Sequence, residues 1–168
     1  MKPELHTTRL HLRPAATADL EALHRLWSDP DVRRHLFDDR TISLDEARSL
    51  LERSEAGFAE RDLGIWCADE RAGEVLVGFA GFLHSDDEPD LVYGLRASQW
   101  GRGLATEAAR RVIEQAFTKP AVERVVASVD EPNRASIRVL ERLGMRRTRR
   151  SVMDGRPLLY YALERDRA

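Results

Sequence analysis

The sequence has 168 residues, a length that favours a single domain over residues 1–168 with a full hydrophobic core. It is 42% hydrophobic and 33% charged, and its longest apolar run, residues 75–83, is too short to span a membrane. The net charge is −2, but residues 1–95 carry 11 basic and 20 acidic side chains, whereas residues 96–168 carry 16 and 9. An anionic ligand therefore fits the second half better.

Several classes of protein and site are not expected. Cys67 is the only cysteine, which excludes an intramolecular disulfide and a cysteine-based zinc site. Residues 1–6 lack the apolar core of a secretory signal, so the expected location is cytoplasmic. The basic run 146–150 has no interleaved aromatic residues and alternates across the faces of a predicted strand, so nucleic acid is not expected as a partner. No metal and no membrane contact are expected, and the oligomeric state stays open.

The first half predicts a strand, two helices and three strands. Thr17 caps the first helix, which ends at the Asp-Pro pair 29–30. Ser43 and Glu46 form a capping box at the start of the second, with Gly57 as a candidate end. The strands are residues 9–13, 65–68, 75–83 and 91–95, with an acidic loop over 85–89.

The second half predicts two helices and three more strands. Apolar residues recur at helical spacing from 104 to 117, and the turn 130–133 can cap a second helix that stops at Gly144. The strands are residues 124–129, 145–153 and 156–164, the last two joined at Asp154-Gly155. The order of elements indicates an α+β (mixed α/β) fold with one sheet of about seven strands and four helices.

A turn with two glycines connects a strand to a helix at residues 99–109. Gly101 and Gly103 leave backbone N–H groups uncovered, and the first helical turn adds the positive end of the dipole, so a phosphate fits there. An ordinary tight helix entry has the same pattern. A dinucleotide enzyme is a further alternative, because Glu123 follows Gly103 by 20 residues, although Thr106 replaces the third glycine of that motif.

Four segments in the right order resemble the GCN5-related N-acetyltransferase (GNAT) superfamily, in the branch that includes ribosomal-protein N-terminal acetyltransferases. They read RLHLRP (9–14), WSDPDV (27–32), WGRGLATEA (100–108), and NRAS through ERLGM (133–145). The resemblance implies a central splayed mixed sheet. It also implies acetyl-CoA as acetyl donor, bound between the strand that ends at Leu95 and the strand that ends at Val129.

The resemblance also implies the residues that bind this donor. The pyrophosphate would contact the backbone of Gly101, Arg102, Gly103, Leu104, Ala105 and Thr106, and pantetheine would pair with the strand end at Tyr93, Leu95 and Arg96. Asn133 would hydrogen-bond pantetheine and Ser136 would face the sulfur. Arg138 is a candidate for the nucleotide phosphates or a solvated residue of its helix.

Two positions depart from the family pattern. Trp100 stands where Arg or Gln is usual, and Ser128 stands where some relatives have a glutamate base. Asp90 is then the candidate base, acting directly or through a water molecule. Deprotonation at pH 7 costs about 1.4 kcal/mol for an α-amine and about 4.6 kcal/mol for a lysine-like amine, so an α-amine needs less help.

The sequence thus predicts acetyl transfer to a primary amine, preferably the N-terminal α-amine of a protein or peptide. A small amine such as a polyamine or aminoglycoside is the alternative acceptor. His24, His35 and His84 could line an amine site or be surface residues. The missing glutamate leaves a non-catalytic acyl-CoA sensor as another alternative.

Overall fold

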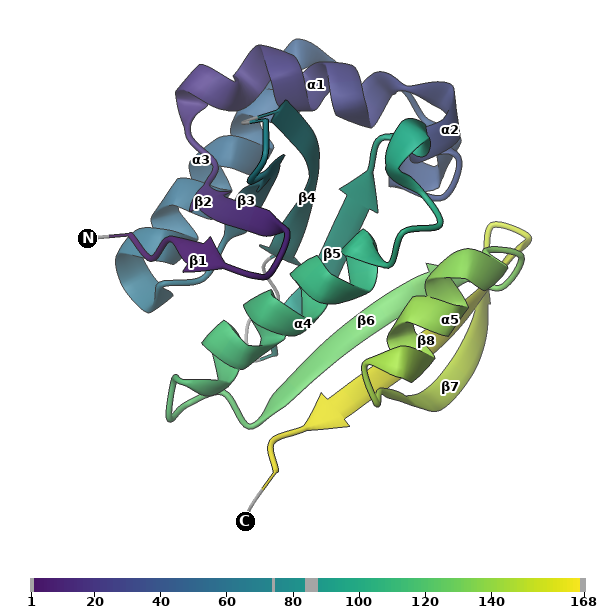
Figure 1. The fold of residues 1–168 in the computed structure, drawn as a ribbon. Coiled ribbons are helices and arrows are strands. Elements are labelled where there is room, and N and C mark those ends of the chain that lie inside the picture. The colour runs from purple at the N-terminus through teal and green to yellow at the C-terminus, as the bar shows by residue number, and fades with distance from the viewer. Residues whose placement is uncertain (1, 74, 84–87, 167–168) are drawn as a thin grey trace.

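The protein is built on one mixed sheet that carries helices on both faces (Figure 1). The computed structural model describes residues 2–73, 75–83 and 88–166. Its strands are Leu5–His6 (β1), Leu10–Pro14 (β2), Ile65–Glu70 (β3), Val75–Leu83 (β4), Asp90–Leu95 (β5), Arg124–Asp130 (β6), Arg146–Met153 (β7) and Arg156–Glu164 (β8). Its α-helices are Leu20–Ser28 (α1), Pro30–Arg33 (α2), Leu44–Arg61 (α3), Leu104–Phe117 (α4) and Arg134–Arg142 (α5).

The strand order is β1-β2-β3-β4-β5-β6-β8-β7, and the pairing between β5 and β6 is parallel while the other pairings are antiparallel. Successive side chains of β3 point to opposite faces and supply two cores. Ile65 and Cys67 pack with the apolar stripes of α1 and α3, whereas Trp66 and Ala68 belong to the cluster that includes α4. Both faces of the central strands are therefore covered.

The sheet opens between β5 and β6. These strands are registered at a single position, Asp90 opposite Val126, where the Val126 amide donates to the Pro89 carbonyl at 3.0 Å. Beyond it, β5 stays paired with β4 to Leu95, and β6 stays paired with β8 to Asp130. The two strands diverge toward their carboxyl ends, as Figure 1 shows, and leave a V-shaped gap at the centre of the sheet.

The start of α3 follows the sequence prediction, but its end does not. The Ser43 hydroxyl accepts a hydrogen bond from the Glu46 amide at 3.1 Å, as the capping box requires. The helix then continues past Gly57 to Arg61 and stops at Asp62, which has φ 55°. A Cβ on Gly57 would lie 2.4 Å from the Leu63 carbonyl oxygen, so this glycine permits close packing rather than ending the helix.

The predicted fold class is confirmed, with two small additional elements. β1 has two residues and α2 has four, both too short to leave a periodic pattern. The arginine-rich run 146–150 is exposed throughout, because β7 is the edge strand and its register shifts between Arg147 and Arg149. No helix in the described ranges is long and apolar enough to cross a membrane. His84 and residues 85–87 of the expected acidic loop lie outside the described residues.

Candidate active site

A cleft of about 680 Å³ lies between β5 and β6. Its walls come from both strands, from the glycine turn and first turn of α4, from α5, and from α2 with the residues that follow it. Ten predicted cofactor residues line the cleft: Tyr93, Leu95, Gly101, Gly103, Leu104, Ala105, Thr106, Asn133, Ser136 and Arg138. The topology therefore brings together two segments that are about 30 residues apart in the sequence.

The glycine turn presents backbone donors to this cleft. Gly101 and Gly103 have φ +78° and +77°, a left-handed conformation that side-chain-bearing residues rarely adopt. Gly103 is the N-cap of α4, so the unpaired amides of the first helical turn follow directly. The Thr106 side chain is also buried, and its hydroxyl has no hydrogen-bond partner among the described residues. Unpaired N–H groups, an unpaired hydroxyl and a positive dipole end suit a phosphate group.

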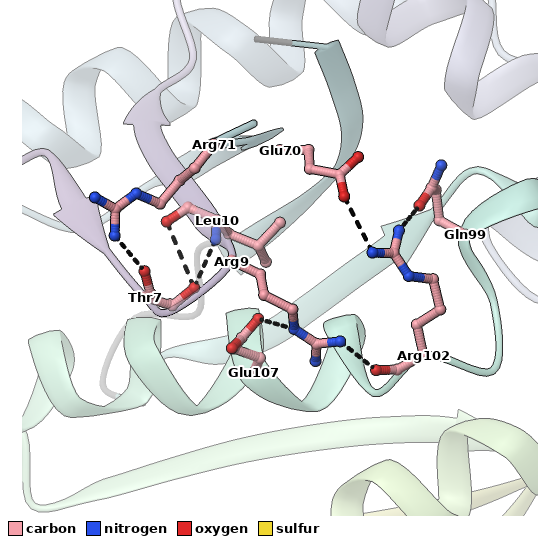
Figure 2. Close-up of polar contacts among 8 residues, drawn as sticks. All are labelled: Thr7, Arg9, Leu10, Glu70, Arg71, Gln99, Arg102 and Glu107. Carbon is pink, nitrogen blue, oxygen red and sulfur yellow. Dashed lines mark hydrogen bonds and ion pairs between the residues drawn. The ribbon is translucent and has the colours of Figure 1, made fainter. Parts of the chain in front are cut away.

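A network of charged side chains holds the glycine turn from outside the cleft. Figure 2 shows Arg9, which precedes β2, donating to the Arg102 carbonyl at 2.8 Å and to Glu107 of α4 at 3.2 Å. The Arg102 guanidinium donates to Glu70 of β3 at 3.0 Å and to Gln99 at 2.5 Å. The Arg102 side chain is thus occupied away from the cleft, and only its backbone belongs to the turn that faces a ligand.

A hydrogen bond links the two sides of the V. The Tyr93 hydroxyl of β5 lies 2.5 Å from the Ser136 hydroxyl of α5, and it also donates to the Ser136 carbonyl at 3.3 Å. Asn133 caps α5, since its side-chain oxygen accepts from the Ser136 amide at 3.2 Å. Burial raises the pKa of Tyr93 to about 12, although the Ser136 hydrogen bond acts in the opposite sense. The phenol is therefore neutral near pH 7 and can donate one hydrogen bond, either to the Ser136 hydroxyl or to the Ser136 carbonyl.

Three predicted site residues lie outside the cleft lining. Arg96 is exposed and its amide donates to the Val77 carbonyl at 2.8 Å, which continues the β4 pairing past Leu95. Arg102 is tied to Glu70, as described above. Asp90 lies at the closed end of the V, where burial raises its pKa to about 6. Its role as the base stays a prediction.

The structure adds a contact at the cleft that the sequence did not connect. His35 lines the cleft, and its Nδ1 lies 2.9 Å from Oδ2 of Asp130 at the end of β6. Arg156 of β8 donates to the same oxygen at 2.8 Å. His35 and Asp130 are 95 positions apart, and no short motif contains both. By contrast, His24 lies outside the lining and its Nε2 pairs with the Ile42 carbonyl at 2.8 Å.

Ser128 lines the cleft and carries no ionisable group, so this position supplies no carboxylate base. One group of potential metal ligands occurs in the described part of the chain, on the opposite edge of the sheet from β7. Glu4, His6 and His11 place their ligand atoms within 4.8 Å of one another on the β1–β2 edge. None of these three residues lines the cleft.

A protein-family model described as an acetyltransferase (GNAT) domain matches residues 9–146, which include β5, β6 and the whole glycine turn. The chain belongs to the GNAT acetyltransferase family. It is therefore an acetyl-CoA-dependent acyltransferase of the N-acetyltransferase class.

This GNAT chain has relatives among bacterial proteins. It is 32% identical over 169 positions to the uncharacterized protein YkkB of Bacillus subtilis, covering 95% of both chains. It is 27% identical to the spermidine N(1)-acetyltransferase of Escherichia coli, over 84% of this chain and 74% of that protein. The Salmonella typhimurium acetyltransferase that modifies the N-terminal serine of ribosomal protein L7/L12 superposes with a TM-score of 0.79 at 19% identity, over 95% of this chain and 97% of that one.

Proposed function

We propose that this GNAT chain transfers the acetyl group of acetyl-CoA to the N-terminal α-amine of a protein or peptide, with both substrates bound at the β5–β6 cleft. One observation carries the proposal. The unpaired amides at the start of α4 and Thr106, whose buried hydroxyl has no partner among the described residues, line the same cleft as the Tyr93–Ser136 pair. The anion-binding amides match the phosphates of an acyl-CoA donor, and the hydroxyl pair matches its thioester.

In this proposal the donor lies along the V. The pyrophosphate contacts the backbone amides of residues 101–106, and pantetheine extends along the β5 edge, which β6 leaves without a strand partner beyond Asp90. The Asn133 side chain has two N–H donors for a pantetheine carbonyl. The Ser136 hydroxyl stabilises the departing sulfur, and Tyr93 supplies the hydrogen bond that keeps the serine oxygen in place. Arg138, which lines the cleft, binds the nucleotide phosphates.

An α-amine is preferred as acceptor because the cleft offers no glutamate at Ser128. At pH 7 an α-amine loses its proton at a cost of about 1.4 kcal/mol, against about 4.6 kcal/mol for a lysine-like amine. The structural likeness to a ribosomal-protein acetyltransferase agrees with this choice. The second candidate is a polyamine, which the spermidine acetyltransferase relative and the Asp31 carboxylate in the cleft lining favour.

The test measures acetyl-CoA turnover against a mixed panel of peptides with free N-termini, spermidine and an aminoglycoside. Thiol release gives the rate and the mass shift of 42 Da per acetyl group identifies the acceptor (about the mass of C₂H₂O). We expect the peptides to react fastest, and the same peptides blocked by N-terminal acetylation to be inert. Faster reaction of spermidine would select the second candidate. Tight binding of acetyl-CoA without turnover of any amine would contradict transfer and favour an acyl-CoA sensor.

A further inference from the structure

A histidine that lines the cleft is hydrogen-bonded to a buried carboxylate. His35 lines the same cleft as Tyr93 and Ser136, and its Nδ1 lies 2.9 Å from an oxygen of Asp130. Asp130 is only 8% exposed, and Arg156 holds the same oxygen at 2.8 Å. Arg156 therefore holds the Asp130 carboxylate in place independently of His35.

This arrangement sets the tautomer of His35. A carboxylate at Nδ1 favours the proton on that nitrogen and leaves the lone pair on Nε2. Nε2 of His35 makes no hydrogen bond to any residue within 2–73, 75–83 or 88–166. Nε2 of His35 therefore has a free lone pair on a side chain that lines the cleft. A general base must lie within reach of the substrate in this way.

We propose that His35 is the general base of the acetyl transfer and that Asp130 is its positioning residue. The proposal rests on the proposed function, since it assigns the proton acceptor for the amine that the cleft acetylates. It also accounts for Ser128, because a base supplied by the segment after α2 removes the need for a glutamate on β6. Asp90 is less well placed for this step, since it lies at the closed end of the V and outside the cleft lining.

The proposed step balances protons and electrons. Nε2 of His35 takes one proton from the acceptor ammonium, and the freed lone pair of the nitrogen attacks the acetyl carbonyl carbon. When the tetrahedral intermediate collapses, the carbon–sulfur bond breaks and its electron pair leaves on sulfur. The second nitrogen proton passes to the thiolate through the Ser136 hydroxyl or water, which gives the amide and free CoA thiol. The imidazolium of His35 then releases its proton to solvent.

The experiment compares His35→Gln with His24→Gln, a matched control whose histidine is bonded to the Ile42 carbonyl outside the cleft. Steady-state rates are measured with the fastest acceptor of the panel above, and acetyl-CoA affinity by calorimetry. We expect kcat to fall by about 10²- to 10⁴-fold in His35→Gln, with acetyl-CoA affinity unchanged and the control like wild type. Added imidazole should restore part of the rate in His35→Ala.

Asp130→Asn tests the positioning role. Loss of the carboxylate removes the acceptor that holds the Nδ1–H tautomer of His35, so kcat should fall while KM stays unchanged. A wild-type kcat in His35→Gln would overturn the assignment of the base while leaving acetyl transfer intact. An Nε2–H tautomer of His35 in a long-range ¹H–¹⁵N spectrum at pH 8 would overturn it without any acceptor. Failure of wild type to bind acetyl-CoA would instead contradict the proposed function.

Discussion

The substitution Gly103→Glu tests whether the start of α4 holds the pyrophosphate. Gly103 has φ +77°, so any residue with a Cβ adopts a strained backbone there at a cost of about 1–2 kcal/mol. A Cβ at this site meets only Arg9 Nη2, at an ordinary contact of 3.6 Å. Packing therefore does not change, and the variant should fold with a modest loss of stability.

The added carboxylate acts on the ligand. At about 6 Å from a phosphate charge and an effective dielectric constant of about 20, the repulsion is about 3 kcal/mol, or roughly a 100-fold weaker affinity. Gly103→Ala carries the same backbone strain without the charge and should weaken binding much less. Isothermal titration calorimetry with acetyl-CoA at fixed salt measures both affinities.

Gly155→Glu is the matched control for this pair of variants. Gly155 has φ +76°, no atom lies within 4 Å of its added Cβ, and it sits in the β7–β8 turn outside the cleft lining. It should lose the same stability as Gly103→Glu and keep wild-type acetyl-CoA affinity. Wild-type affinity in Gly103→Glu, or equal losses in the two glutamate variants, would refute the placement of the pyrophosphate.

Three other variants give separate readouts. Ser136→Ala should lower kcat about 10- to 100-fold with little change in acetyl-CoA affinity, because the departing sulfur loses a donor; an unchanged rate of thiol release would contradict this. Arg9→Gln frees the Arg102 carbonyl and should raise the KM for acetyl-CoA about tenfold at constant kcat. Equal KM values in the variant and in wild type would show that the glycine turn keeps its conformation without Arg9. Burial raises the pKa of Asp90 from 3.8 to about 6, so its contribution to stability is full below about pH 4 and is lost as the pH rises through 6. In urea unfolding, Asp90→Asn should therefore be stabilising by up to about 3 kcal/mol at pH 7 and nearly neutral at pH 4; equal effects at both pH values would contradict the raised pKa.

The parts of the site that the sequence predicts are those encoded within one short segment. Gly101 and Gly103 sit between a strand pattern and a helix pattern, and both take the left-handed conformation that a turn of this kind needs. The Asn133 cap of α5 likewise follows from local turn chemistry. The family resemblance placed these two segments on one cofactor, and the structure brings both into the cleft lining.

Contacts between distant segments could not be predicted in the same way. The sequence places His35 in a loop-like setting, and only the crossing of the segment after α2 over the end of β6 brings it to Asp130. The sequence places Arg9 in a strand motif, whereas in the structure its guanidinium donates to the Arg102 carbonyl 93 positions away. Pairings of this kind depend on the sheet order, which periodicity in a single sequence does not specify.

The most direct test of the account is backbone amide hydrogen exchange with and without saturating acetyl-CoA. We predict that exchange slows at residues 101–106 and along the β5 edge at 93–95, because amides that contact solvent in the free protein hydrogen-bond to the bound donor. Unchanged exchange at 101–106, with acetyl-CoA demonstrably bound, would contradict the central claim that the glycine turn at the start of α4 holds the pyrophosphate.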